Sequence, residues 1–360
     1  MSQGNKSGQD RFSRFWSSAS GFWRGKSAMS SWPLTVGLLA IAVSQLAVQY
    51  RLNYWNRDFF NALQRRDADG LWSQAVLFVP LACLSVGLSV TSVWGRMTTQ
   101  RKWRQWLTTH ILGTWLAQER YRRIEAVTGE YKNAEYRISF DTRVATDAPV
   151  DLALGFVNSV MTAFVFIGVL WNVGGSFTVV LGQTEITVPG YLVLGVGIYA
   201  LVFTSAMIAI GRKLPAVIQT ENQAEAELLA AASQIRESGR RAEPEAGEVE
   251  NHQLAWDALR QVLARWRQLC WQLMGTTMVS QTDLLFAPVV AWVLCAPKYL
   301  SGAMTLGELT QASAAFVTVQ VAFNWLVDNY GRLSDWRSAV SRVAVLLLAL
   351  DEVAPLEREE

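Results

Sequence analysis

Six long stretches of this 360-residue chain carry almost no charged residue, and they constrain the fold more than any other feature. Crossing the ~30 Å hydrocarbon core of a bilayer takes about 20 apolar residues in a helix. Asp, Glu, Lys and Arg make up 17% of the chain, against about 25% in soluble domains. We therefore predict an all-α membrane protein with six transmembrane helices, near residues 32–50, 71–95, 152–174, 186–211, 269–297 and 305–327.

The positions of Lys and Arg predict which side of the membrane each connection faces, because loops rich in these residues stay in the cytoplasm. Of the 32 basic residues, 27 lie before the first span, in connections 96–151 and 212–267, or after the sixth span. This pattern predicts a multi-pass membrane protein with both termini in the cytoplasm. It is weakest behind the first span, where NYWNRDFFNALQRRD carries basic residues on the outer side.

The two inner connections are each 56 residues long and poor in Pro and Gly, whereas the outer connections are short. Runs such as QTENQAEAELLAAASQIRE in the second of them favour a helix. We therefore expect helices 2 to 5 to continue into the cytoplasm as two long hairpins.

The ends of the chain differ from the six-helix domain, which we place at residues 32–350. Residues 1–31 interleave aromatic and basic residues, which is typical of a cytoplasmic or interfacial helix in the headgroup region rather than a cleavable signal peptide. Residues 351–360 form a charged tail. The three cysteines have no metal-ligand spacing, and we predict that they are buried, with no disulfide or metal role: Cys83, Cys270 and Cys295. For the protein as a whole we predict no cofactor and no nucleic-acid partner.

Polar residues recur at helical spacing on three of the predicted spans. Stripes of this kind are candidates for the lining of a wet central pathway for substrate. The first helix carries Gln45, Gln49, Asn53 and Arg57; the fifth carries Gln272, Thr276, Ser280 and Asp283; the sixth carries Ser313, Gln320, Asn324 and Asp328.

Asp283 and Asp328 are candidates for proton coupling, because a carboxyl group in a span is costly and usually faces a cavity or a partner. Asp283 interrupts an otherwise uncharged span. The alternatives are that Asp283 pairs with a basic residue or bonds across helices, and that Asp328 lies in water at the cytoplasmic edge. For Asp283 we favour the functional interpretation, and for Asp328 the structural one.

Two sequence blocks carry a specific resemblance to a known family: NYWNRDFFNALQRRD and, at residues 296–337, APKYLSGAMTLGELTQASAAFVTVQVAFNWLVDNYGRLSDWR. A weaker block is VDLALGFVNSVMTAFVFIGVLW at residues 150–171. From about residue 33 onward the chain resembles the ABC-exporter-type membrane domains of the bacterial YddA group. This group is related to peroxisomal ABC half-transporters and to the SbmA/BacA peptide transporters. The resemblance implies a homodimer with helix exchange.

The energy source is a separate question, because the sequence has no GxxxxGK[ST] phosphate loop and no complete ABC signature. The first inner connection has NAEYRI where the ATP-driven group usually has Pro-Asp-Gln-Arg-Ile, and the second has RESGRRAEPEAGE where it has Glu-Asn-Ala-Glu. These departures lie where the cytoplasmic hairpins would bind an ATPase. They therefore favour proton coupling, which the resemblance to SbmA/BacA also implies. The candidate residues for this cytoplasmic coupling region are Asn133, Arg137, Arg236 and Glu237.

We therefore expect a transporter, not an enzyme, that moves peptides or other sizeable hydrophilic molecules across the bacterial inner membrane by alternating access. One alternative is the permease subunit of an ATP-driven transporter that pairs with a separate ATPase. A second is an inactive membrane scaffold.

Overall fold

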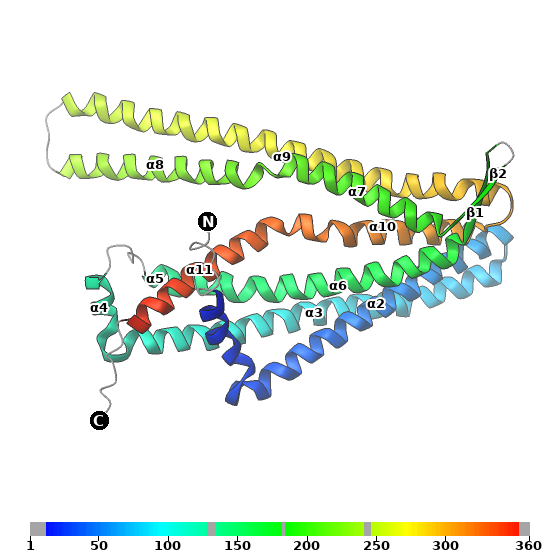
Figure 1. The fold of residues 1–360 in the computed structure, drawn as a ribbon, viewed down its shortest axis with the longest axis horizontal. Coiled ribbons are helices and arrows are strands. Elements are labelled where there is room, and N and C mark those ends of the chain that lie inside the picture. The colour runs from blue at the N-terminus through cyan, green and yellow to red at the C-terminus, as the bar shows by residue number, and fades with distance from the viewer. Residues whose placement is uncertain (1–11, 128–133, 182–183, 241–245, 353–360) are drawn as a thin grey trace. The chain divides into compact units, whose positions relative to one another are not determined.

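The long uncharged stretches fold as long helices in the computed structural model, which describes residues 12–127, 134–181, 184–240 and 246–352 (Figure 1). The chain divides into two units, which we describe separately. Unit 1 holds Met1–Val173 and Ala296–Glu360, and unit 2 holds Gly174–Cys295.

Unit 1 is built on five long helices, and α2, α3, α6 and α10 lie side by side (Figure 1). The turn between the first two is well defined: Arg66 adopts a left-handed conformation (φ 56°), and the Asp67 carboxylate caps α3 by accepting from the Gly70 N–H. The helices are α2 (Ala28–Arg65), α3 (Ala68–Leu116), α6 (Thr142–Gly174), α10 (Leu306–Asp328) and α11 (Tyr330–Glu352).

Short elements join the long helices of unit 1. A helix over residues 12–19 begins the described chain. The other short elements are η1 (Ser20–Trp23), η2 (Gly25–Ser27), η3 (Ala117–Glu119), α4 (Arg120–Val127), α5 (Ala134–Tyr136) and η4 (Arg137–Asp141), of which η4 is a π-helical turn.

Unit 2 starts with an antiparallel hairpin of β1 (Ser176–Leu181) and β2 (Thr184–Pro189), paired from Ser176↔Pro189 to Leu181↔Thr184. It continues with α7 (Tyr191–Gly211), α8 (Leu214–Arg240) and α9 (Ala246–Leu300). Apart from this hairpin the described residues are nearly all helical, as predicted, but residue 186, the predicted start of the fourth span, lies in β2 and the helix begins at Tyr191. The β-branched residues of SFTVVL and TEITVP favour strands.

Among the described residues, five helical segments are long and apolar enough to cross a membrane: Ala28–Arg65, Ala68–Arg123, Ala134–Gly174, Tyr191–Glu237 and His252–Leu300. They coincide with five of the six predicted spans. The sixth predicted span forms α10, which is not among these five segments, and its crossing of the membrane stays a prediction. At 1.5 Å per residue, the 55 residues of α9 extend about 80 Å, far more than a bilayer requires.

The hydrophobic core of unit 1 lies at one end of the bundle, away from the apolar stretch of α3. Trp103 is 1% exposed and donates its indole N–H to the Ala19 carbonyl at 3.2 Å. Phe22 stacks on it at 6.4 Å, while Phe15 is also buried. We call the buried apolar residues of this region the core cluster: Phe15, Ala19, Phe22, Trp103, Leu107, Ile111, Ala134, Ile138, Ala145, Val150, Val340, Val343, Ala344, Leu346, Leu347, Ala349 and Leu350.

The core cluster changes the interpretation of the N-terminal segment. Phe15 and Phe22 pack on protein instead of facing lipid, whereas Phe12 stays exposed as expected of an interfacial side chain. The prediction of three buried cysteines is right for Cys295 only, because Cys83 and Cys270 are exposed on α3 and α9.

Candidate functional site

The N-terminus of α10 is capped by its own side chains. Thr305 accepts from the Glu308 backbone N–H at 3.2 Å, and the Glu308 carboxylate accepts from the Thr305 N–H at 2.9 Å. This reciprocal capping box satisfies two of the backbone donors that a helix start leaves open. The sequence TLGE at residues 305–308 has the S/T-x-x-E pattern that is typical of a capping box.

Helix α2 supplies the remaining partners of the α10 N-terminus. The Leu306 N–H donates to Gln64 Oε1 at 2.9 Å, and the Gly307 N–H donates to Asn61 Oδ1 at 3.0 Å. A Cβ atom at Gly307 would collide with the backbone oxygen of Arg57. The absent side chain at Gly307 therefore allows α10 to begin in direct contact with the end of α2.

Two amide side chains lie buried where α2 and α10 meet farther along. Asn53 donates its Nδ2 proton to the Gln311 backbone carbonyl at 3.2 Å. Within the described residues, neither polar atom of the fully buried Gln311 side chain has a hydrogen-bond partner, and the same holds for Asn53 Oδ1. Gln311 is not part of the polar stripe predicted on the sixth span, and its contact with Asn53 joins residues 258 positions apart, so no local pattern indicates it.

The polar stripe predicted on the first helix does not lie on one face. Asn53 is buried against α10, Gln45 is partly buried, Gln49 is exposed, and Arg57 pairs with Asp58 at 2.9 Å. A step of four residues advances 400° around a helix with 3.6 residues per turn, so three steps rotate the stripe by about 120°. Of the four predicted residues, only Asn53 has a described hydrogen bond to α10.

The polar residues of α10 lie in three different surroundings. Ser313 and Gln320 are buried, and Gln320 donates to Asn324 Oδ1 at 3.4 Å. Asp328 is the last residue of α10 and is exposed. The proton-coupling role of Asp328 stays a prediction.

In unit 2, Asp283 lies buried in α9 and is 8% exposed. The Tyr199 hydroxyl of α7 donates to the Asp283 backbone carbonyl at 3.1 Å. The helices approach closely nearby, because a Cβ at Gly195 would lie 2.6 Å from the Leu294 side chain. Asp283 therefore faces the seam between α7 and α9.

The other polar residues of the α9 stripe separate along the helix. Gln272 donates to the Ile210 carbonyl at the end of α7, and Thr276 donates to the Leu273 carbonyl of its own helix at 3.0 Å. Ser280 is exposed. The structure thus brings Gln272 and Asp283 to α7, and it turns Ser280 outward.

The predicted cytoplasmic coupling region is only partly described. Asn133 lies outside the described residues, and Arg137 begins the π-helical turn η4. Arg236 and Glu237 are exposed near the end of α8. Their role in coupling stays a prediction.

The same π-helical turn holds a buried ion pair that sequence analysis missed. Arg342 of α11 donates to both carboxylate oxygens of Asp141, at 2.9 and 2.7 Å, and Asp141 is fully buried. Hydrogen bonding to Asp141 raises the pKa of Arg342. Because the two residues are 201 positions apart, no local pattern indicates the pair.

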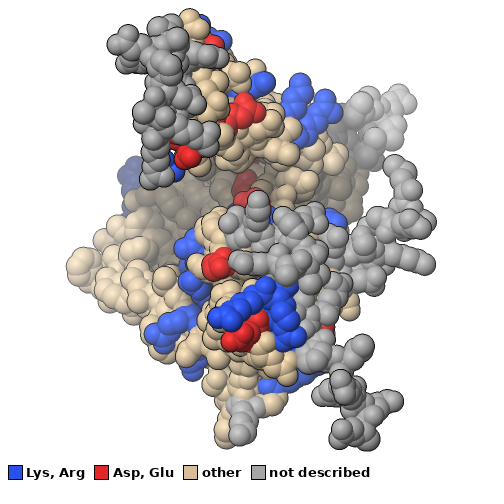
Figure 2. Space-filling model, turned by 90° about the vertical axis from the view of Figure 1, so that its left-hand side faces the viewer, with Lys and Arg blue, Asp and Glu red and all other residues tan. Residues whose placement is uncertain are grey.

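A second acidic residue connects three helices of unit 1. Asp151 of α6 accepts from Arg332 at 2.7 Å and from Gln100 at 2.8 Å, and it lies 3.3 Å from Arg96. One turn earlier, burial raises the pKa of Asp147. Figure 2 shows Lys, Arg, Asp and Glu side chains on the end of unit 1 that carries α4, as expected of a surface in water.

Comparisons with known proteins match this chain to one family over most of its length. Residues 25–300 match the model of the ABC transporter transmembrane region 2. The chain is 26% identical over 333 residues to the inner membrane ABC transporter ATP-binding protein YddA of Escherichia coli, covering 89% of this chain and 58% of YddA.

Two further relatives are more distant. The chain is 24% identical to an uncharacterized ABC transporter ATP-binding protein of Synechocystis, over 90% of this chain and 48% of that protein. It is 20% identical to the chloroplastic ABC transporter D family member 2 of Arabidopsis thaliana, over 92% of this chain and 44% of that protein. The chain spans about half the length of the curated relatives it matches.

Proposed function

This chain belongs to the family of the ABC transporter transmembrane region 2, and on that premise we propose that it moves peptides or other sizeable hydrophilic molecules across the bacterial inner membrane. Its function in membrane transport follows from the family. The substrate class, the alternating-access mechanism and the source of energy are the proposed part.

We propose that two copies enclose the transport pathway. Gln49 and Ser280 belong to apolar helices, yet each is exposed on a single copy. Polar side chains that face acyl tails are unfavourable, so they are expected to meet water or a second protein surface. A homodimer with a wet interior supplies both.

The proposed proton coupling is supported by the burial of Asp283. Its side chain is buried in an apolar stretch of α9, beside the Tyr199 hydroxyl. Ionisable residues at such depth characterise proton relays and substrate pathways. In the proposed cycle, the Asp283 carboxyl group takes up a proton while the pathway is open to one side and releases it on the other.

The test is uptake of a labelled peptide by proteoliposomes with an imposed pH gradient. Asp283→Asn is expected to abolish gradient-driven uptake. Asp257→Asn is the matched control, because Asp257 lies on the same helix, is exposed and pairs with Arg260. Peptide exchange without a gradient should survive in both variants, which shows that the pathway is intact. Undiminished uptake by Asp283→Asn would refute the coupling role.

A second candidate is favoured by the names of the relatives, which include ABC transporter ATP-binding proteins. In this version, a separate ATPase subunit binds the cytoplasmic helices and drives the same pathway. Co-purification of an ATPase, together with ATP-dependent uptake that does not need a pH gradient, would decide for it.

A further inference from the structure

Exposed tryptophans on α2 and α3 mark where unit 1 meets the membrane surface. Trp72 and Trp94 of α3 are 72% and 65% exposed, and tryptophan is enriched at membrane interfaces. The 22 residues between them rise about 33 Å, close to the ~30 Å hydrocarbon thickness. Trp32 of α2 is exposed as well, and Leu38 of α2 packs on Gly95. Trp32 and Trp94 therefore indicate the same membrane surface.

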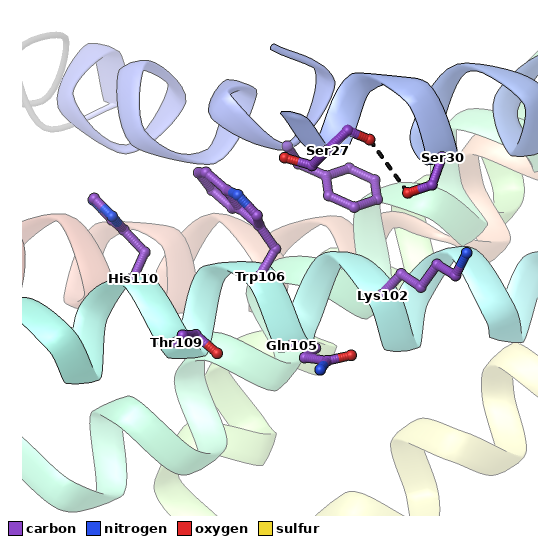
Figure 3. Close-up of a pocket in the computed structure, with 8 residues that line it drawn as sticks. Ser27, Ser30, Lys102, Gln105, Trp106, Thr109 and His110 are labelled. Atoms are coloured by element: carbon purple, nitrogen blue, oxygen red, sulfur yellow. Dashed lines mark hydrogen bonds between the residues drawn. The ribbon is translucent and has the colours of Figure 1, made fainter. Parts of the chain in front are cut away.

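A pocket of about 540 Å³ opens just beyond this surface (Figure 3). One wall comes from the segment that leads into α2, and the other comes from α3. Figure 3 shows Lys102 and Ser30 at one end of the pocket and His110 at the other. The lining residues are Phe22, Ser27, Ser30, Lys102, Gln105, Trp106, Thr109 and His110.

The aromatic floor of the pocket is held by close packing. The Trp106 indole stacks on the His110 ring with centroids 5.6 Å apart and planes 7° from parallel. A Cβ at Gly21 would lie 2.5 Å from the Trp106 ring, so a glycine at this position leaves room for the indole. The shape of the pocket therefore depends on contacts between two segments distant in the sequence.

The polar groups of the pocket suit an anion. They comprise the Lys102 ammonium group, the hydroxyls of Ser27, Ser30 and Thr109, and the Gln105 amide; none of the described residues that line the pocket is Asp or Glu. A phosphate group accepts several hydrogen bonds and is attracted by a fixed positive charge. The N-terminus of helix α2 at Ala28 carries the partial positive charge of the helix dipole. No acidic residue in the first turn of α2 offsets this charge.

We propose that this pocket binds the phosphate of an acidic phospholipid headgroup, of the phosphatidylglycerol class. The lipid is preferred to free phosphate as the source because the exposed apolar side chains of Met29 and Trp32 continue from the pocket along α2. Acyl chains attached to the bound headgroup would cover them. The Lys102 stem is long enough to place its ammonium group back toward the interface.

The experiment titrates the delipidated full chain with phosphatidylglycerol and, separately, phosphatidylcholine, and counts bound lipid by native mass spectrometry. Lys102→Gln is expected to weaken phosphatidylglycerol binding about fivefold, the effect of one Lys at an acidic surface. Lys102→Arg should restore most of the affinity. Arg101→Gln, an exposed neighbour on α3 that does not line the pocket, is the matched control and should change it less than about twofold.

Each outcome has a defined meaning. Equal affinity of the wild type for the two lipids, or unchanged binding by Lys102→Gln with the same unfolding temperature, would overturn the proposal. Displacement of bound phosphatidylglycerol by inorganic phosphate would show a site for free anion and would overturn the lipid as its ligand. None of these results depends on transport activity, so the proposed function is tested independently.

Discussion

The two halves of α3 have similar apolar side chains and opposite surroundings. Residues 72–94, the membrane half, expose their apolar side chains, and none of the most apolar window of this helix is buried. Residues 103–111, the core half, place Trp103, Leu107 and Ile111 in the core cluster. In water, burying apolar surface drives folding, whereas in lipid an exposed apolar side chain already has a favourable solvent. Packing should therefore matter far more for stability in the core half.

The largest expected effect compares two tryptophans of the same helix. Trp103→Ala should lower the free energy of unfolding by about 3–5 kcal/mol, because it empties a buried aromatic site. Trp94→Ala should cost less than about 1 kcal/mol, because Trp94 is mostly exposed. Thermal unfolding in mild detergent measures both. Equal losses would break the comparison between the two halves.

The next effect concerns the ion pair beside the core cluster. Arg342→Ala should cost about 2–3 kcal/mol, because it leaves the buried Asp141 carboxylate without its guanidinium partner. The side chain of Arg342 is 47% exposed, which keeps the cost at the lower end for a buried pair. The double variant Arg342→Ala with Asp141→Asn should recover part of the loss. Additive losses measured by denaturant unfolding would contradict this coupling.

A third variant locates tight packing outside the core cluster. Gly307→Ala should destabilise the protein by about 1–2 kcal/mol, because its Cβ collides with α2. Gly87→Ala is the control in the membrane half of α3, where a Cβ would meet no atom within 4 Å. It should be neutral or stabilise by up to about 1 kcal/mol, since alanine favours a helix. The same thermal assay distinguishes them, and a stable Gly307→Ala variant would show that α10 is free to shift.

The smallest effect is a dependence on pH near the core cluster. Burial raises the pKa of Asp147 above its ordinary value, so the ionised form disfavours the folded state. Asp147→Asn should therefore be slightly more stable at pH 7, by a few tenths of a kcal/mol, because partial solvent exposure screens the effect. The advantage should vanish as the pH falls through the raised pKa toward about 3.9. An advantage that persists at low pH would show a cause other than charge.

Most of the helical architecture could be predicted from the sequence, because hydrocarbon excludes charge from about 20 consecutive residues. The hairpin was not predicted: β1 lies in the short outer connection between the third and fourth predicted spans, and the apolar end of β2 was assigned to the fourth span. The span at α10 is the least apolar of the six, because Gln311, Gln320 and Asn324 interrupt it. Hydropathy alone cannot tell whether such a helix faces lipid or protein.

The candidate site was predicted less completely than the fold. Asp283 stood out because a single carboxylate in an apolar run is visible without neighbours. Asn53 and Gln311, or Asp141 and Arg342, acquire meaning only when distant segments meet. Stripes at steps of four also overstate continuity, since the rotation of a helix carries Gln49 and Asn53 into different surroundings.

The contact between the end of α2 and the start of α10 has a mechanical consequence. Asn61 and Gln64 accept hydrogen bonds from the first two backbone amides of α10, and Gly307 packs directly against the backbone of α2. Because these hydrogen bonds join α2 and α10 at one end, the two helices can rotate about this contact but cannot slide along each other. Any motion that separates α2 from α10 must therefore pivot at this contact, and the opposite ends of the two helices would move the greatest distance.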